Sequence, residues 1–533
     1  MCSSVLRRWL ANGAGPKDLR GDDDVTKHLE QEAAPPIAGE EREPNLRWWD
    51  GFTISLAIPA ALFIGMGAAI GAIGGWTALV ILATVATIAC LQNFIYSEVA
   101  TMFPRMVGGI AAYANEAWRR RSTIVGPLAA FGYWFAWSSS LGVYGLQIGY
   151  LAQAQWFPDQ TWSFSTGLAD VGFPHIVGLG VMIVGWALNV VGLRLAMWVM
   201  YVTGAILLVP VLVFALAPFF SGEWDINNLQ WALGDSGFPG WQTFIAWAFV
   251  LAWTVFGVEA VSSFTPEYKK PVSDTRRALR VSGIFVLFVF ILVPLGVGGL
   301  AKREDVIADP VAFYLGLFDK LMPGGSLIVT VCLIAGLLLM MLMTYADTGR
   351  VLEGSARSGL TIKQLGVTNR FGMPARASTL DLIFNIFLIF FVGGALAIVT
   401  AGITGYILCH ILALSGFLLL RKDRPKRLRP VKLSRIWVVI ASVLLGIDVV
   451  LFVIGLASGE ITGYGGPREI IIAVFVLALS LVLFYIRRVV QDRKKFVWRD
   501  PEPLTAEDRG ERDPEAVGSL FPSEVSSAPP RAE

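Results

Sequence analysis

The chain has 533 residues, of which 55% are hydrophobic and only 16% are charged, and its mean hydropathy is +0.61. A soluble protein normally carries about 25% charged residues, so this complement is too small to cover a water-facing surface. Long apolar runs also exclude collagen-like and coiled-coil classes, and they exclude a transmembrane β-barrel, whose strands alternate over about ten residues. The composition therefore predicts a polytopic α-helical membrane protein.

Twelve stretches of the chain are long and apolar enough to cross a membrane as helices. A spanning helix needs about 20 mostly apolar residues. The segment 1–49 before them is polar and charged, so no cleavable signal peptide is predicted there. The predicted spans are 50–72, 76–102, 124–155, 174–193, 195–220, 241–263, 280–300, 325–350, 374–395, 397–420, 434–457 and 468–488.

Basic residues are divided unequally between the two sides of the predicted membrane. If segment 1–49 is cytoplasmic, 39 of the 43 Lys and Arg residues lie on that side. An excess of Lys and Arg marks the cytoplasmic side of membrane proteins. We therefore expect a multi-pass protein of the cell (cytoplasmic) membrane with both termini in the cytoplasm. The tail 489–533, which is rich in Pro, Ser and Glu, is predicted to be disordered.

The first ten spans form two blocks of five, residues 50–220 and 241–420, and a further pair of spans follows at 434–488. Because five is odd, a second copy of the first block would cross the membrane in the opposite direction. Span 1 carries Pro59 and span 6 carries Gly257, and an interrupted first helix in each half is typical of transporters with inverted repeats. The predicted fold class is all-α, with 12 transmembrane helices, a 5+5 inverted repeat and broken spans 1 and 6.

Four stretches share a pattern of aromatic, glycine and charged residues with one known family. In span 6, Trp253 is followed by Gly257 and then by Glu259, and an acidic, basic and proline-containing loop comes next. The chain resembles the amino acid–polyamine–organocation (APC) superfamily, and span 6 is similar to its arginine/agmatine antiporter branch. The resemblance runs from residue 50 to about 420 and implies the LeuT-like fold. The other stretches are 96–114, 189–194 and 349–374.

The resemblance implies a substrate site at the two helix breaks. The family usually has a Gly-x-Gly break in span 1, whereas this chain has Pro59-Ala60-Ala61. Proline lacks a backbone donor and disrupts the helix, so we expect the backbone near residues 58–62 to leave α-helical geometry and face Gly257. A substrate carboxylate would then bind neighbouring amides, and Trp253 would stack on the substrate. The expected substrate-binding residues are Ile58, Ala60, Ala61, Leu62, Tyr133, Trp253 and Gly257.

Two buried acidic residues are candidates for coupling or gating. Glu259 is an isolated carboxylate at membrane depth, where a charge is costly and therefore usually functional. Asp347 in span 8 either pairs with Arg350 on the same helical face or forms a cation or proton site with the hydroxyls of Thr344 and Thr348. His410 in span 10 is expected to be a hydrogen-bonded structural histidine.

These patterns predict a secondary active transporter, or permease, for an amino acid or related organic amine. An exchanger (antiporter) of such substrates remains an alternative, as does a non-transporting membrane scaffold or channel. The sequence contains no HExxH, GxSxG or Walker motif, so we expect neither an enzyme nor a metal site nor a cofactor. The expected partners are a small-molecule substrate and lipid, not nucleic acid. The sequence leaves open whether the coupling ion is a proton or sodium, which substrate is carried and whether the protein forms a homo-oligomer.

Overall fold

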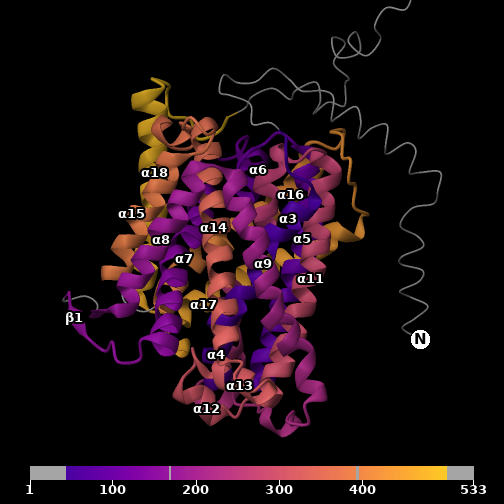
Figure 1. The fold of residues 1–533 in the computed structure, drawn as a ribbon. Helices are drawn as coiled ribbons and strands as arrows, with labels where there is room; N and C mark the ends of the chain where they lie inside the picture. Colours follow the sequence, from indigo (N-terminus) through magenta and orange to yellow (C-terminus); the bar gives the residue numbers. More distant parts are fainter. Residues whose placement is uncertain (1–43, 167–169, 392–394, 501–533) are drawn as a thin grey trace, which may run out of the picture.

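The computed structural model describes residues 44–166, 170–391 and 395–500, and most of them lie in long helices that run along one axis of the molecule (Figure 1). The only sheet among these residues is the short antiparallel pair β1–β2. In chain order the elements are α3 (Trp48–Ser55), α4 (Ile58–Ile73), α5 (Gly75–Met102), α6 (Gly109–Trp118), α7 (Val125–Trp156), β1 (Ser163–Ser165), β2 (Asp170–Gly172), α8 (Phe173–Val191), α9 (Leu193–Leu216), η1 (Ala217–Phe220), η2 (Ile226–Asn228), η3 (Leu233–Ser236), α10 (Gly240–Val255), η4 (Val258–Glu267), α11 (Pro271–Leu300), α12 (Arg303–Ala308), α13 (Phe313–Leu321), α14 (Ser326–Arg357), η5 (Lys363–Gly366), α15 (Ala375–Phe391), α16 (Ala395–Asp423), α17 (Ile436–Ala457), η6 (Gly459–Thr462), α18 (Pro467–Tyr485) and η7 (Ile486–Gln491).

Ten helical segments in the described part of the chain are long and apolar enough to cross a membrane. Two of the predicted spans are not among them. The span expected at 124–155 corresponds to α7, which is rich in Gly, Ser and aromatic residues. The span expected at 374–395 corresponds to α15, which has 17 residues. The polytopic helical membrane architecture is thus established, with α7 and α15 as additional helices of the same bundle.

The first and sixth of the predicted spans are both interrupted, and they form the centre of the bundle. The first consists of α3 and α4, joined at Leu56–Ala57, and the sixth consists of α10 and η4, joined at Phe256–Gly257. Of the 18 consecutive residues that are most apolar in each of these two segments, 89% are buried. The corresponding share is 28% in α17 and 22% in the segment containing α18. The two interrupted segments are therefore surrounded by protein, while α17 and α18 lie at the periphery.

The interruption in the first segment lies one turn earlier than the sequence predicted. We expected residues 58–62 to leave α-helical geometry, but α4 is helical from Ile58 onward. Leu56 and Ala57 form a turn between α3 and α4 that keeps right-handed helical dihedral angles, with φ of −60° and −59°, and the Ala57 amide donates to the Ile54 carbonyl at 3.3 Å. Pro59 occupies the first turn of α4, a position that tolerates its missing donor. A proline disturbs the turn that precedes it, because its missing N–H and its ring act on the carbonyl four residues back.

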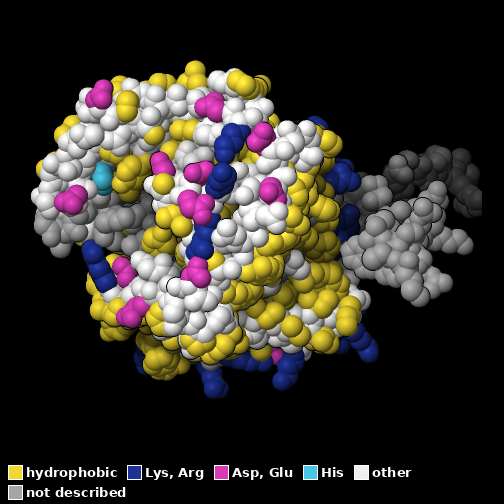
Figure 2. Space-filling view, turned by 90° about the horizontal axis from the view of Figure 1, so that it is seen from below, with side chains coloured by type: hydrophobic (Ala, Val, Ile, Leu, Met, Phe, Trp, Pro, Cys, Tyr) yellow, Lys and Arg dark blue, Asp and Glu magenta, His cyan; other side chains and the backbone are white. Residues whose placement is uncertain are grey.

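The bundle has two chemically different ends. We call one the α6 end; it carries α6 and the last turns of α18, at the top of Figure 1. The opposite α12 end carries α12 and α13, and Figure 2 looks onto it, with Asp and Glu side chains scattered over the surface. At the α6 end, the Thr123 amide donates to the Trp498 carbonyl and the Asp500 amide donates to the Arg119 carbonyl, both at 2.9 Å. Residues 489–500 of the tail predicted as disordered therefore hold defined structure, and 501–533 lie outside the described residues.

A buried ion cluster at the α6 end ties three parts of the chain together. The Glu98 carboxylate on α5 accepts hydrogen bonds from Arg421 on α16 and from the amide of Leu433, the first at 2.8 Å to Nε. Arg429 Nε lies 3.2 Å from the same carboxylate. Glu98 is fully buried, so its charge is compensated entirely by these neighbours.

Removal of the Glu98 charge tests how much this cluster stabilises the fold. We expect Glu98→Gln to lower the free energy of unfolding by about 3–5 kcal/mol, because Arg421 and Arg429 would keep their charges without the carboxylate that compensates them. The measurement is an unfolding titration with sodium dodecyl sulfate in mixed micelles. Asp235→Asn is the control, since Asp235 pairs with Arg303 at 2.8 Å but is 57% exposed, and it should cost less than about 1 kcal/mol. Equal losses in the two variants would contradict this role.

Candidate functional site

The break in the sixth segment is a true change of backbone direction, and it requires glycine. Phe256 is extended, and Gly257 has φ of +149°, a conformation that residues with a side chain rarely adopt. A Cβ atom at Gly257 would lie 2.3 Å from Ile58 Cδ1 and 3.0 Å from Trp137 Cη2. Gly257 therefore both turns the chain and allows the two interrupted segments to touch, with Ile58 in direct contact.

The Glu259 side chain folds back onto this break. Its Oε2 atom accepts a hydrogen bond from the Gly257 amide at 3.0 Å, and its Oε1 atom accepts one from the Tyr406 hydroxyl of α16. The side chain is buried. A free amide at a helix N-terminus attracts anions, and here the protein's own carboxylate occupies that position. Glu259 thus lies at the break itself rather than on the far side of it.

The amides that the sequence assigned to a substrate carboxylate are engaged within the protein. The Ala60 amide donates to the Ala57 carbonyl at 3.0 Å, and Pro59 has no amide hydrogen. Ala61 and Leu62 continue inside α4 and are buried. In this conformation neither break presents Gly257 or Ala60 as a donor for an external anion.

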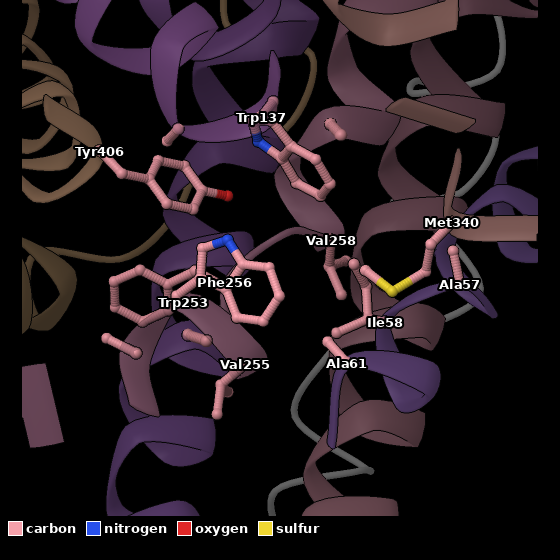
Figure 3. Close-up of a cluster of buried hydrophobic side chains, with 14 of the residues drawn as sticks. Ala57, Ile58, Ala61, Trp137, Trp253, Val255, Phe256, Val258, Met340 and Tyr406 are labelled. Carbon is pink, nitrogen blue, oxygen red and sulfur yellow. The ribbon is translucent and has the colours of Figure 1, made fainter. Parts of the chain in front are cut away.

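Aromatic rings surround the break on the side away from α4. Figure 3 shows the rings of Trp137, Trp253, Phe256 and Tyr406 gathered together, with Ile58 on the other side of the view. The ring of Tyr406 lies edge-on to Trp137 with their centroids 6.0 Å apart, and Trp253 donates from Nε1 to Ser140 Oγ at 2.9 Å. The Trp137 indole nitrogen is buried and has no hydrogen-bond partner among the described residues. Trp253 therefore faces the interior, not the lipid.

Asp347 lies next to this aromatic group, and it does not pair with Arg350. Its Oδ2 atom accepts a hydrogen bond from the Tyr133 hydroxyl at 2.9 Å, and its Oδ1 atom has no hydrogen-bond partner within the described ranges. Arg350 instead binds Glu267 of η4 through Nε at 2.6 Å and Nη2 at 3.0 Å. The ring of Tyr133 packs edge-on against Tyr406, with centroids 5.6 Å apart. Tyr133 and Tyr406 therefore connect Asp347 with Glu259.

Sequence reasoning missed a third buried carboxylate beside the same helices. Asp381 on α15 accepts hydrogen bonds from Trp134 Nε1 at 2.7 Å and from the Thr348 hydroxyl at 2.8 Å. Thr348 therefore faces Asp381 rather than Asp347, and Thr344 lies near Tyr144. An acidic residue within the predicted span 374–395 is the signal that would have identified Asp381, by the same reasoning that selected Glu259.

Two residues of α16 complete the surroundings of Glu259, and neither was selected as a site residue. Tyr406 donates to its carboxylate, and His410 Nε2 lies 3.8 Å from its Oε1 atom. The two residues are four positions apart, so they share one face of α16. That i, i+4 pair of polar residues in an apolar span was visible in the sequence, but its partner on η4 was not.

A small cavity borders the first interrupted segment in the conformation described. On the α12 side of the break, a cavity of about 20 Å³ lies between α4, α7 and α14. This volume accommodates roughly one water molecule. Its lining residues are Ala60, Phe63, Ile64, Gln147, Leu151, Val311, Leu333 and Leu337. This cavity is therefore too small for an amine or an amino acid.

Comparison with known families agrees with this architecture. The model of the amino acid permease family matches residues 46–481, which include both helix breaks and every residue discussed at the site. A search of curated proteins finds no match.

Replacement of Gly257 tests whether the break depends on its backbone conformation. We expect Gly257→Ala to destabilise the protein by about 1–3 kcal/mol, because alanine at this φ is strained and its Cβ overlaps Ile58. Gly180→Ala on α8 is the control, since a Cβ there meets nothing within 4 Å, and it should change stability by less than about 1 kcal/mol. Unfolding titrations of both variants provide the comparison, and a Gly257→Ala protein as stable as the control would contradict the constraint.

Proposed function

The chain belongs to the amino acid permease family of the APC superfamily, and from this premise we propose that it carries an organic amine across the membrane by alternating access. It is a transporter with ten helices of membrane-spanning length and composition in its described part. The choice of an amine rests on one observation, namely that the Gly257 amide at the centre of the site already donates its hydrogen bond to the Glu259 carboxylate.

The chemistry around the break favours a cation over an anion. Two carboxylates, Glu259 and Asp347, are buried there, and their direct hydrogen-bond donors are tyrosine hydroxyls and a backbone amide rather than Lys or Arg. The faces of Trp137, Trp253 and Tyr406 lie close by (Figure 3). Aromatic faces attract ammonium groups, and the attraction grows when water is excluded. A protonated amine would supply a positive charge in direct contact with these carboxylates, which none of their hydrogen-bond donors carries.

An amino acid remains the second candidate, and the family match favours it. Its ammonium group would use the same carboxylates and rings as an amine. Its carboxylate, however, would require the Gly257 amide, and Glu259 would have to release that amide first. Such a displacement distinguishes the two candidates, since only an amino acid substrate demands it.

The packing pattern supports the inverted repeat that we propose for the first ten spans. When five is added to each span number, several closely packed helix pairs of the first ten spans correspond to other closely packed pairs. Thus α7 with α16 corresponds to α14 with α9, while α7 with α8 corresponds to α14 with α15. The pair α5 with α11 maps onto itself. This relation counts α7 and α15 as spans, which gives the proposed total of twelve.

We propose that the α6 end faces the cytoplasm. Most Lys and Arg residues of the sequence lie in the connections at this end, and positive charge marks the cytoplasmic side. The Glu267–Arg350 pair joins η4 to α14 on this side of the break, and both side chains are buried. A path from the site to the cytoplasm requires these two helices to separate, so this ion pair would close the cytoplasmic route in the present conformation.

The amine proposal is tested by ligand stabilisation of the purified protein. A ligand at 100 times its Kd raises the apparent stability by about 2.7 kcal/mol. We expect monoamines or polyamines to stabilise the protein more than the amino acids from which decarboxylation would generate them. Uptake of the selected amine into proteoliposomes then separates a transporter from a scaffold that only binds it, and exchange for internal amine identifies an antiporter.

Replacement of Trp253 tests the position of the bound amine. Because cation–π contact is worth about 0.5–2 kcal/mol, Trp253→Ala should weaken the selected amine's affinity by about tenfold. Trp198→Ala is the matched control, because Trp198 on α9 is 65% exposed on the outer surface of the bundle. Equal affinities in the two variants would place the amine elsewhere, and stabilisation by amino acids alone would overturn the amine proposal.

A further inference from the structure

A second row of buried polar groups leads from Glu259 to the outer helix α17. His410 Nε2 on α16 lies 3.8 Å from Glu259 Oε1, and His410 Nδ1 lies 2.8 Å from the Tyr96 hydroxyl of α5. One turn away on α5, Gln92 donates from Nε2 to Asp448 Oδ2 of α17 at 2.8 Å. The row therefore passes through four helical elements and ends at a carboxylate outside the ten helices of the proposed repeat.

Regular helix geometry places these groups in line. Gln92 and Tyr96 are four residues apart on α5, so they lie one above the other on the same face. Tyr96 is within electrostatic range of both Asp448 and Glu259. Asp448 also interacts with His410. His410 is thus within electrostatic range of two acidic groups, Glu259 and Asp448.

The packing of α17 does not account for the presence of an acidic residue, Asp448, on this apolar helix. It is the only ionisable residue between Ile436 and Ala457, on a helix of which only 28% of the most apolar window is buried, yet Asp448 itself is fully buried. An acidic residue in a spanning helix costs about 2.5–3.5 kcal/mol on insertion, so such residues usually serve a function. No salt bridge to Lys or Arg is present for it among the described residues, where Gln92 is its hydrogen-bond donor.

Unfilled hydrogen-bonding capacity is concentrated along the same row. His410 Nε2, Gln92 Oε1 and Asp448 Oδ1 are buried without a hydrogen-bond partner in the part of the chain that the structure describes. An unsatisfied buried polar atom costs roughly 1–3 kcal/mol. A proton on Asp448 or on His410 Nε2 would convert one of these atoms into a donor. The arrangement is therefore better suited to carry an exchangeable proton than to remain in a single charge state.

The groups that face the two ends of the row are few. Asp448 faces His410 on α16 and Gln92 and Tyr96 on α5, while α10, which also packs along α17, has no ionisable residue in Gly240–Val255. His410 faces Glu259 of η4, Tyr96 of α5, Asp448 of α17 and its own neighbour Tyr406. Glu259 and Asp448 are therefore the two carboxylates among the groups that face His410.

We propose that Asp448 and His410 share an exchangeable proton, which sets the charge beside Glu259 and couples amine transport to protons. When the proton passes from the Asp448 carboxyl to the His410 ring, a carboxylate and an imidazolium replace two neutral groups. A cationic amine at Glu259 repels the imidazolium and drives the proton back to Asp448, or out to water once the site opens. This inference rests on the proposed function, since it assigns the coupling ion of the same site.

Histidine NMR tests the proton site without any substrate. The chain has 3 His residues, so a histidine-labelled protein in nanodiscs gives few ring signals, and the His410 signal is the one lost in His410→Gln. We expect Asp448→Asn to lower the ratio of protonated to neutral His410 at a fixed pH by at least about fivefold. The removal of one nearby negative charge in a medium of effective dielectric constant near 20 produces an effect of this size. Asp448→Glu should restore the ratio.

The matched control is Asp381→Asn, which removes another fully buried carboxylate that is held by Trp134 and Thr348 rather than by His410. It should leave the His410 titration unchanged. A His410 signal that is identical in wild type and Asp448→Asn at every pH would overturn the proposal, as would an equal shift in the Asp381→Asn control. Because no amine is added, failure of the amine proposal in the stabilisation screen is a separate result from failure of the proton site.

Discussion

The backbone at Gly257 is the constraint on which the rest of the site depends. Its positive φ ends α10, and its missing side chain admits Ile58 of the other interrupted segment. The same turn leaves the Gly257 amide without a partner in the helix, and this amide donates a hydrogen bond to the Glu259 carboxylate. That carboxylate in turn positions Tyr406, beside which Tyr133, Asp347 and His410 are arranged. One glycine thus links helix interruption, helix contact and the placement of buried charge.

The buried charges fall into two groups with different consequences. Glu98 and Glu267 pair directly with arginine side chains at the α6 end, so they can hold helices in a fixed arrangement. Glu259, Asp347 and Asp448 are bound instead by tyrosine hydroxyls or by amides, which donate hydrogen bonds but carry no charge, and the protonatable His410 ring lies near Glu259. Fixed charge pairs suit the closing of a route, while protonatable surroundings suit the binding of a cation and its exchange against protons.

The sequence predicted the features that depend on local chemistry. Long apolar runs gave the helical membrane architecture, and the Gly257 break was visible because glycine is the residue that a reversed φ demands. The position of the first break was wrong by one turn, because Pro59 acts on the turn before it. The partners of Glu259, Asp347 and Arg350 could not be read from the sequence. They come from helices separated by more than 80 residues along the chain, and they depend on how the helices pack.

A cryo-electron microscopy map with the best-stabilising amine from the ligand screen tests the central claim most directly. The account predicts ligand density between the two helix breaks, against the rings of Trp137 and Trp253, with its nitrogen beside Glu259 or Asp347 and span 6 still interrupted at Gly257. Density bound outside this space, or a span 6 that continues as a regular helix through Gly257, would contradict the account.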